Sequence, residues 1–295
     1  MGMRLFRGFI VVMIASVVVW WLNIPFLDSE RDESLTVVTS TPMIKDMVHK
    51  LMGPDVNVVS LTFTGSNPKA QAIDPDRLSE LTRAAVVIIN GNGYDDQFLD
   101  SAPTFNAKLI DLSKQLGRAS AKLDTYYWMN PYEYITTIEF LTVTLTRLFP
   151  DRRSEINYRK FAYVDSIYAL TQNVRDQMEL IKTDQPVLAS NHASFNSFAN
   201  AFGFKTIIID LSEPLNETTL TDTIDKLKQH NIKVLYPVEG VEIQGMDLLL
   251  EVALAQGWQL QLANPIMTLN LDGANSGVNT YVELLEYNFR TLSDG

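Results

Sequence analysis

The chain contains no cysteine, and this absence removes several kinds of chemistry at once. Without thiols there can be no disulfide bond, no thiolate metal site, no cysteine nucleophile and no lipid-modified N-terminal cysteine. Histidine is scarce as well, with three among 295 residues. The signatures of common enzymes are missing: there is no Gly-x-Ser-x-Gly, no phosphate-binding lysine loop and no His-Glu-x-x-His. We therefore expect a binding protein and not an enzyme.

Positively charged residues are outnumbered: the chain has 24 Lys and Arg and 35 Asp and Glu, which gives a net charge of −11. Nucleic acids and anionic lipid surfaces attract proteins with the opposite balance, so neither is expected to be the main partner. The composition, 46% hydrophobic and 20% charged, is that of a folded protein with sizeable cores. A length of 295 residues allows one large domain or two smaller ones.

One long apolar run lies near the N-terminus, at residues 8–27, and Arg4 and Arg7 precede it. Its length is about that of a bilayer, and its basic flank is expected on the cytoplasmic side. No small-residue cleavage site follows it, while Trp20-Trp21 suits a membrane interface. These features favour an uncleaved signal anchor over a cleaved signal peptide, the alternative that stays open. In both cases we expect residues after about Asp28 on the periplasmic or extracellular face of the cytoplasmic membrane.

Short apolar runs then alternate with helical spacing. Strands are expected at residues 35–39, 56–63 and 84–90. The third run is continuously apolar, which is typical of a parallel strand covered on both faces. We predict an N-terminal α/β lobe over residues 28–150, with the glycines of segment 91–94 at the edge where open parallel sheets bind ligands. The acidic pair Asp95-Asp96 is interpreted as a solvated loop.

Strand signals stop between residues 131 and 181, where long helical patterns take over. The second pattern, residues 153–181, would span about 40 Å, enough to run along a whole domain. Its apolar positions fit one buried stripe: Ile156, Phe161, Val164, Ile167, Tyr168, Leu170 and Val174. We predict a linking helix over residues 151–182.

A second alternating region closes the chain. Strands are expected at 187–189, 206–209 and 234–236, and helices at 220–229, 246–255 and 280–292. This predicts a C-terminal α/β lobe over residues 183–295. The expected fold is therefore two lobes, each with a mostly parallel sheet flanked by helices, joined by one long helix and preceded by the membrane segment of residues 1–27. We expect a monomer.

Four segments point to a family: Gly65-Ser66-Asn67-Pro68-Lys69, Tyr126-Tyr127-Trp128-Met129-Asn130-Pro131, Ser190-Asn191-His192-Ala193-Ser194-Phe195, and Leu271-Asp272. In this order and at these spacings, the chain after residue 34 resembles the periplasmic zinc/manganese-binding proteins, the solute-binding subunits of ABC importers. The resemblance implies that the chain binds zinc or manganese between its lobes and delivers the ion to an ABC permease and its ATPase. It also implies no catalysis.

Members of this family usually hold the metal with three histidines and one carboxylate. Here the resemblance assigns the third histidine to His192 and the carboxylate to Asp272, while Lys69 and Tyr126 stand where the first two histidines are expected. An ammonium group repels a dication, and a phenol with a pKa of about 10 is a weak ligand at neutral pH. The implied metal ligands are therefore His192, Asp272 and Tyr126, with Lys69 in the cleft instead of a ligand.

Two other arrangements of the cleft are open. Lys69 can pair with Asp272 and supply the positive charge that a metal would bring, or oxygen groups can build a harder, manganese- or calcium-like site: Asn67, Asp74, Asp76 and Glu239. The alternative function is a descendant that no longer binds metal and acts as a membrane-anchored adhesin, scaffold or regulatory binding protein. His49 and His230, at the ends of expected helices, are interpreted as surface or capping residues.

Overall fold

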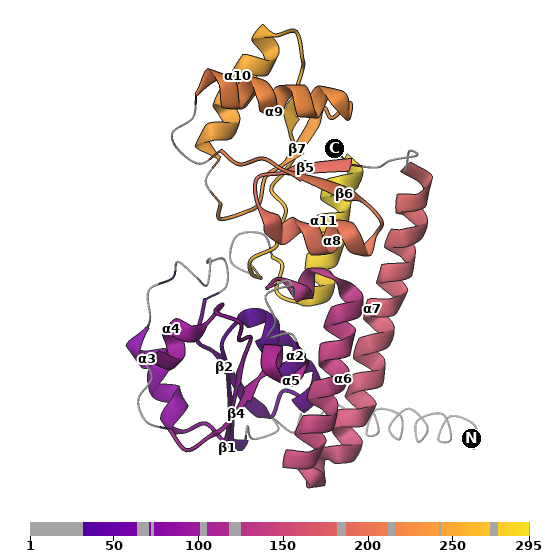
Figure 1. Cartoon of the computed structure of the whole chain (residues 1–295). Helices are drawn as coiled ribbons and strands as arrows, with labels where there is room; N and C mark the ends of the chain where they lie inside the picture. The colour runs from indigo at the N-terminus through magenta and orange to yellow at the C-terminus, as the bar shows by residue number, and fades with distance from the viewer. Residues whose placement is uncertain are drawn as a thin grey trace, which may run out of the picture.

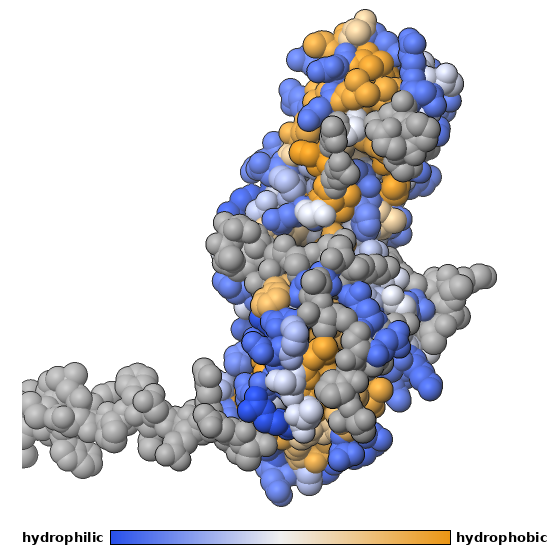
Figure 2. Space-filling view, turned by 90° about the vertical axis from the view of Figure 1, so that its left-hand side faces the viewer, coloured by the Kyte–Doolittle hydropathy of each residue, from blue (hydrophilic) through white to orange (hydrophobic). Residues whose placement is uncertain are grey.

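The computed structural model describes residues 32–63, 71, 74–100, 105–117, 125–181, 187–211, 216–241, 243–271 and 277–294. It has two α/β lobes, one above the other, with the long helix α7 (Arg153–Ile181) beside both (Figure 1). Seen from the side away from α7, the molecule is elongated and polar and apolar side chains share its surface (Figure 2). Within the ranges just given, no helix has the length and apolar character needed to cross a membrane, and the expected anchor at residues 8–27 lies outside them.

The first lobe is built on a parallel sheet in the order β2-β1-β3-β4. Its strands are β1 (Asp32–Thr39), β2 (Val56–Ser60), β3 (Val86–Ile89) and β4 (Lys108–Asp111), and its helices are α2 (Pro42–Met52), α3 (Pro75–Ser79), η1 (Glu80–Thr82), α4 (Asp96–Asp100) and α5 (Leu112–Gln115). All four residues of β3 are buried, as a continuous apolar run predicts. Strand β4 was not expected, because its first two residues are exposed and it has no such run.

The second lobe repeats this topology, with a parallel sheet in the order β6-β5-β7-β8. Its strands are β5 (Val187–Ser190), β6 (Lys205–Ile208), β7 (Val234–Tyr236) and β8 (Gln261–Leu262), and its helices are η4 (Ala193–Phe195), α8 (Asn196–Ala201), α9 (Glu217–Gln229) and α10 (Gln244–Ala255). The two sheets thus confirm the expected α/β architecture. The division into domains at residues 150 and 182 stays a prediction.

Helices η2 (Tyr127–Met129), α6 (Pro131–Leu148), η3 (Pro150–Arg152) and α7 lie between the lobes in sequence, and α11 (Tyr281–Asp294) ends the chain. The side chain of Asn130 caps α6 and Pro131 occupies its first turn, both common at a helix start. Helix α7 has the range that its helical pattern predicts, but the expected buried stripe is wrong at two positions. Phe161 and Tyr168 are 60% and 44% exposed. Phe161 precedes buried Tyr163 by two residues, about 200° around the helix, so it faces away from the core.

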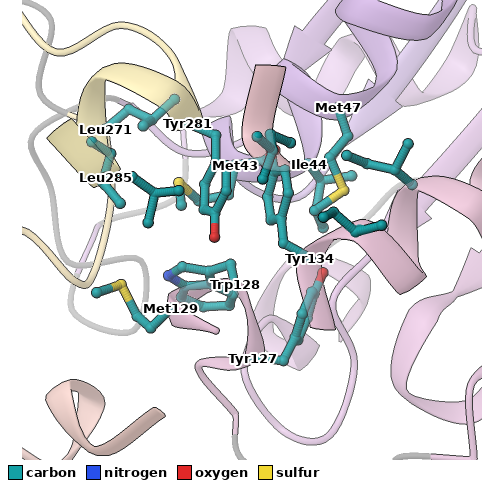
Figure 3. Close-up of a cluster of buried hydrophobic side chains, with 14 of the residues drawn as sticks. Met43, Ile44, Met47, Tyr127, Trp128, Met129, Tyr134, Leu271, Tyr281 and Leu285 are labelled. Carbon is teal, nitrogen blue, oxygen red and sulfur yellow. The ribbon is translucent and has the colours of Figure 1, made fainter. Parts of the chain in front are cut away.

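One buried cluster includes side chains of α2, α6, α7, α8 and α11 and so continues from one lobe into the other. At its centre the ring of Tyr134 stacks on that of Tyr281, with centroids 3.5 Å apart and planes 6° from parallel, beside Trp128 (Figure 3). Because Tyr281 begins α11 and Tyr134 lies in α6, this stack attaches the end of the chain to the helices beside the first lobe.

A buried carboxylate lies next to that stack. The Oδ2 atom of Asp46, in α2, accepts hydrogen bonds from the Tyr163 hydroxyl at 2.5 Å and from the backbone N–H of Tyr281 at 3.2 Å. Asp46 therefore joins α2, α7 and the N-terminus of α11. Burial raises its pKa above the ordinary value, while the hydrogen bonds from Tyr163 and Tyr281 oppose this rise.

Candidate functional site

His192 lies two residues after the end of β5, where the chain turns into η4 and α8. Its half-buried ring acts as the N-cap of η4, because its Nδ1 atom accepts a hydrogen bond from the backbone N–H of Ser194 at 3.1 Å. The hydroxyl of Ser194 lies 2.7 Å from the same nitrogen. The strand end and the cap together fix the position of the imidazole at the carboxyl edge of the sheet, where parallel sheets present ligand-binding groups.

The Ser194 hydroxyl connects His192 to a buried residue of the protein interior. It is hydrogen-bonded to the hydroxyl of Thr268, and both residues are fully buried. When Nδ1 of His192 carries the ring proton, it donates to Ser194 and leaves Nε2 available as a metal ligand. When Nδ1 instead accepts from the Ser194 N–H, the proton of a neutral ring is on Nε2. The Ser194 hydroxyl is thus the group able to stabilise the metal-binding tautomer.

Tyr126 lies just before η2, as the N-cap residue of that helix. Its ring lies edge-on to that of His192, with centroids 5.5 Å apart and planes at 79°. Tyr94 and Trp128 pack against Tyr126 at centroid distances of 5.8 and 5.5 Å. The structure therefore brings together two of the four predicted site residues. Lys69 and Asp272 lie outside the described residues. The ligand roles of His192, Tyr126 and Asp272, and the place of Lys69 in the cleft instead of a ligand, stay predictions.

The lobes meet at a short segment, residues 268–271, that leads directly to Asp272. Trp128 donates from Nε1 to the carbonyl of Thr268 at 2.8 Å, and the Tyr94 hydroxyl donates to the carbonyl of Leu269 at 3.4 Å. The side-chain amide of Asn270 in turn donates to the carbonyl of Phe63 at 2.6 Å. Burial raises the pKa of Tyr94 well above its ordinary value, with Tyr126 and Asp95 adding to the rise, so Tyr94 remains a neutral donor.

Asp95 corrects one interpretation of the sequence. The pair Asp95-Asp96 was expected in a solvated loop, yet Asp95 is fully buried. Its carboxylate accepts from the backbone N–H groups of Asn90 at 2.5 Å and Gly91 at 2.9 Å. It thereby closes the turn that follows β3 and precedes Tyr94, whose buried ring packs against Tyr126 and Trp128. The one signal in the sequence was a carboxylate four residues after a glycine turn, a spacing that suits such self-capping.

The remaining candidates have ordinary structural places. Asp74 caps α3 by accepting from the N–H of Asp76 at 3.0 Å, and Asp76 itself is exposed. His49 and His230 are exposed, and His230 ends α9, as predicted. In the part of the chain that the structure describes, no three His, Asp or Glu side chains gather into a group that could hold a metal. Asn67 of the proposed oxygen site lies outside that part.

Comparisons with known proteins agree on one family. A family model described as "Zinc-uptake complex component A periplasmic" matches residues 37–295. The zinc-binding protein TroA of Treponema pallidum is 20% identical over 276 residues, which cover 90% of each chain. The manganese-binding lipoprotein MntA of Bacillus subtilis is 20% identical over 274 residues, which cover 89% of this chain and 90% of MntA. The solved structure of TroA superposes with a TM-score of 0.77 at 19% identity, over 88% of this chain and 98% of that one.

Proposed function

Because the chain belongs to the family of periplasmic zinc-uptake component A proteins, we propose that it captures a zinc or manganese ion outside the cytoplasmic membrane and delivers it to an ABC permease and its ATPase. The observation that carries this proposal is the meeting of His192 and Tyr126 between the lobes, 5.5 Å apart, at two positions where the family resemblance places metal ligands. A zinc-binding and a manganese-binding relative of nearly the same length support the choice of cargo.

The proposed ligands are the imidazole of His192, the carboxylate of Asp272 and the phenol oxygen of Tyr126. Imidazole and carboxylate suit both zinc and manganese. The phenol contributes most after losing its proton, which a bound dication favours. Lys69 would add a positive charge to the same cleft, so we expect weaker binding than a site with three histidines and a carboxylate gives.

For the place of the protein in the cell, we propose that residues 8–27 anchor the chain in the cytoplasmic membrane and that everything after about Asp28 lies outside. The division into a lobe of residues 28–150, a linking helix of 151–182 and a lobe of 183–295 belongs to the same proposal. One parallel sheet precedes α7 in the sequence and the other follows it, which supports this division. No comparison supports the adhesin or scaffold alternative.

The test is metal titration calorimetry on the purified full-length chain, stripped with a chelator and offered zinc and manganese separately. We expect sub-micromolar binding that His192→Ala abolishes and that His230→Ala leaves intact. His230 is the matched control because it is exposed at the end of α9, away from the cleft. Absence of binding with both metals, or equal binding by the two variants, would contradict the proposal.

A further inference from the structure

The end of the α6–α7 pair at which a short turn joins the two helices carries large apolar side chains on its surface. Tyr158 and Phe161, in the first turns of α7, are 78% and 60% exposed, and Val143, near the end of α6, is 57% exposed. The two helices are antiparallel, so Val143 and Tyr158 lie at similar distances from the turn that joins them, at the bottom of the view in Figure 1. Exposed apolar side chains that lie together on a protein surface commonly mark a contact surface.

Positive charge is concentrated at the same end. Residues 147–160 contain five basic side chains, Arg147, Arg152, Arg153, Arg159 and Lys160, against two carboxylates, Asp151 and Glu155. Two of the five are in ion pairs, Arg152 with Asp55 and Arg159 with Glu155. The balance is therefore the reverse of that of the whole chain, whose net charge is −11. The Lys160 ammonium lies 4.0 Å from the centre of the Phe161 ring, so apolar surface and positive charge form one patch.

The chain enters the first lobe beside this patch. The first described residue, Asp32, pairs in the sheet with Val56. Asp55, the residue before Val56, forms an ion pair with Arg152 at the start of α7. Between Leu27, the end of the apolar run, and Asp32 there are only residues 28–31, which can reach about 17 Å when fully extended. Phe161 lies about 12 Å along α7 from its first residue. An anchor at residues 8–27 would thus hold this end of the molecule near the membrane surface.

We propose that Tyr158, Phe161 and the basic side chains around them rest on the phospholipid headgroups of the membrane that holds the anchor. Aromatic side chains favour the interface between headgroups and acyl chains, and lysine and arginine extend their charges to lipid phosphates. The tether, residues 28–31, carries Asp28 and Glu30 against one basic residue, Arg31, and is net negative, so the helical pair supplies the excess of positive charge. The contact gives the anchored protein a fixed orientation, with the cleft above the membrane surface.

This inference rests on the anchoring part of the proposed function, and the absence of cysteine makes it directly testable. Single cysteines are introduced into the full-length chain as Tyr158→Cys, Phe161→Cys, Tyr168→Cys and Leu254→Cys, and each is labelled with an environment-sensitive fluorophore. The proteins are reconstituted into vesicles of phosphatidylethanolamine and phosphatidylglycerol that contain lipids with a quencher in the upper acyl chain. Tyr168, about 15 Å farther along α7 than Tyr158, and Leu254, 66% exposed in the second lobe, are the controls.

We expect quenching and a blue shift for the labels at positions 158 and 161, with a loss of fluorescence several times that at 254, and an intermediate or small effect at 168. Equal quenching at 158 and 254 would overturn the inference. Flotation of the vesicles separates the premises: protein that fails to float overturns the anchor, whereas protein that floats without quenching at 158 and 161 overturns the lipid contact alone. Metal titration of the same samples reports on ion capture independently.

Discussion

At the residue scale, the cleft depends on how one imidazole is held. Ser194 contacts Nδ1 of His192 twice, through its N–H at 3.1 Å and through its hydroxyl at 2.7 Å. Of these two groups, only the hydroxyl can accept a hydrogen bond from a protonated Nδ1. A metal on Nε2 needs the proton on Nδ1, where the Ser194 hydroxyl can accept a hydrogen bond from it, whereas the Ser194 N–H favours the proton on Nε2. The serine therefore acts on metal affinity through the histidine and without touching the ion.

We predict that Ser194→Ala weakens zinc binding by about 10- to 100-fold, the usual effect of losing the partner of a metal-bound histidine. Affinity is measured by competition with a chelating dye. Ser194→Thr keeps the hydroxyl and should retain most of the affinity. The matched control is Ser166→Ala, whose hydroxyl donates to the carbonyl of Tyr163 within α7. The interpretation fails when Ser194→Ala and Ser166→Ala bind zinc equally well.

Lys69 supports a second prediction, which rests on the sequence and on charge. Replacing its ammonium group removes repulsion from a dication, and replacing it with an imidazole also adds a ligand. We expect Lys69→Met to tighten zinc binding moderately and Lys69→His to tighten it further, by about tenfold or more relative to Lys69→Met. Calorimetry on the three proteins measures both steps. Identical affinities for all three would show that Lys69 lies away from the ion.

At the element scale, Asp46 joins α2, α7 and α11 through its hydrogen bonds from Tyr163 and Tyr281. Burial raises its pKa above the unfolded value of about 3.9. The folded state therefore holds a proton on Asp46 over a pH range where the unfolded state has released it. The stability from this group is fully present below pH about 4 and is lost as pH rises through the folded pKa.

We predict that Asp46→Asn flattens this dependence: between pH about 4 and 7, the free energy of unfolding should fall less steeply with pH than in the wild type. Urea unfolding at a series of pH values measures the slope. The neighbouring His49 and Lys50 remain in both proteins, so the difference isolates the carboxyl group. Asp225→Asn, at a carboxylate that is 66% exposed, is the control for the loss of one acidic side chain. Parallel curves for wild type and Asp46→Asn would contradict the prediction.

The same scale shows what the sequence could predict. Strand β3 was predictable because it is an unbroken apolar run, and β1 and β5 because each contains a short apolar segment. Strands β4 and β8 were not, since one begins with two exposed residues and the other has two residues. The range of α7 was predictable from its spacing, but not its buried face, because apolar residues occur on both sides and only packing decides which side is covered.

The candidate site was predictable in part for the same reason. The segment around His192 is recognisable from the sequence alone, as a histidine between a predicted strand and a predicted helix. The contacts of that histidine with Tyr126 and, through Ser194, with Thr268 join residues 66 and 76 positions away, and no local pattern encodes them. Asp95 was missed because a carboxylate that accepts backbone N–H groups has the same local composition as one in water.

At the scale of the whole molecule, the lobes share a core and a set of hydrogen bonds. Trp128 Nε1 to Thr268 joins the lobes, and a second indole offers a matched comparison: Trp258 donates to the carbonyl of Ile232 at 2.9 Å within the second lobe alone. The two bonds have nearly the same length, 2.8 and 2.9 Å, but only one crosses between the lobes. The pair can therefore separate the coupling of the lobes from the stability of one lobe.

We predict that Trp128→Phe and Trp258→Phe each lower the free energy of unfolding by about 1–3 kcal/mol, because each leaves a carbonyl without its donor. Only Trp128→Phe should increase hydrogen exchange in residues 266–271 together with η2 (Tyr127–Met129), since that bond holds the two segments against each other. Zinc affinity should fall in parallel, because Thr268 also holds Ser194 and through it His192. Hydrogen exchange that rises equally in both variants, or is confined to the second lobe, would mean that the shared core and not this bond couples the lobes.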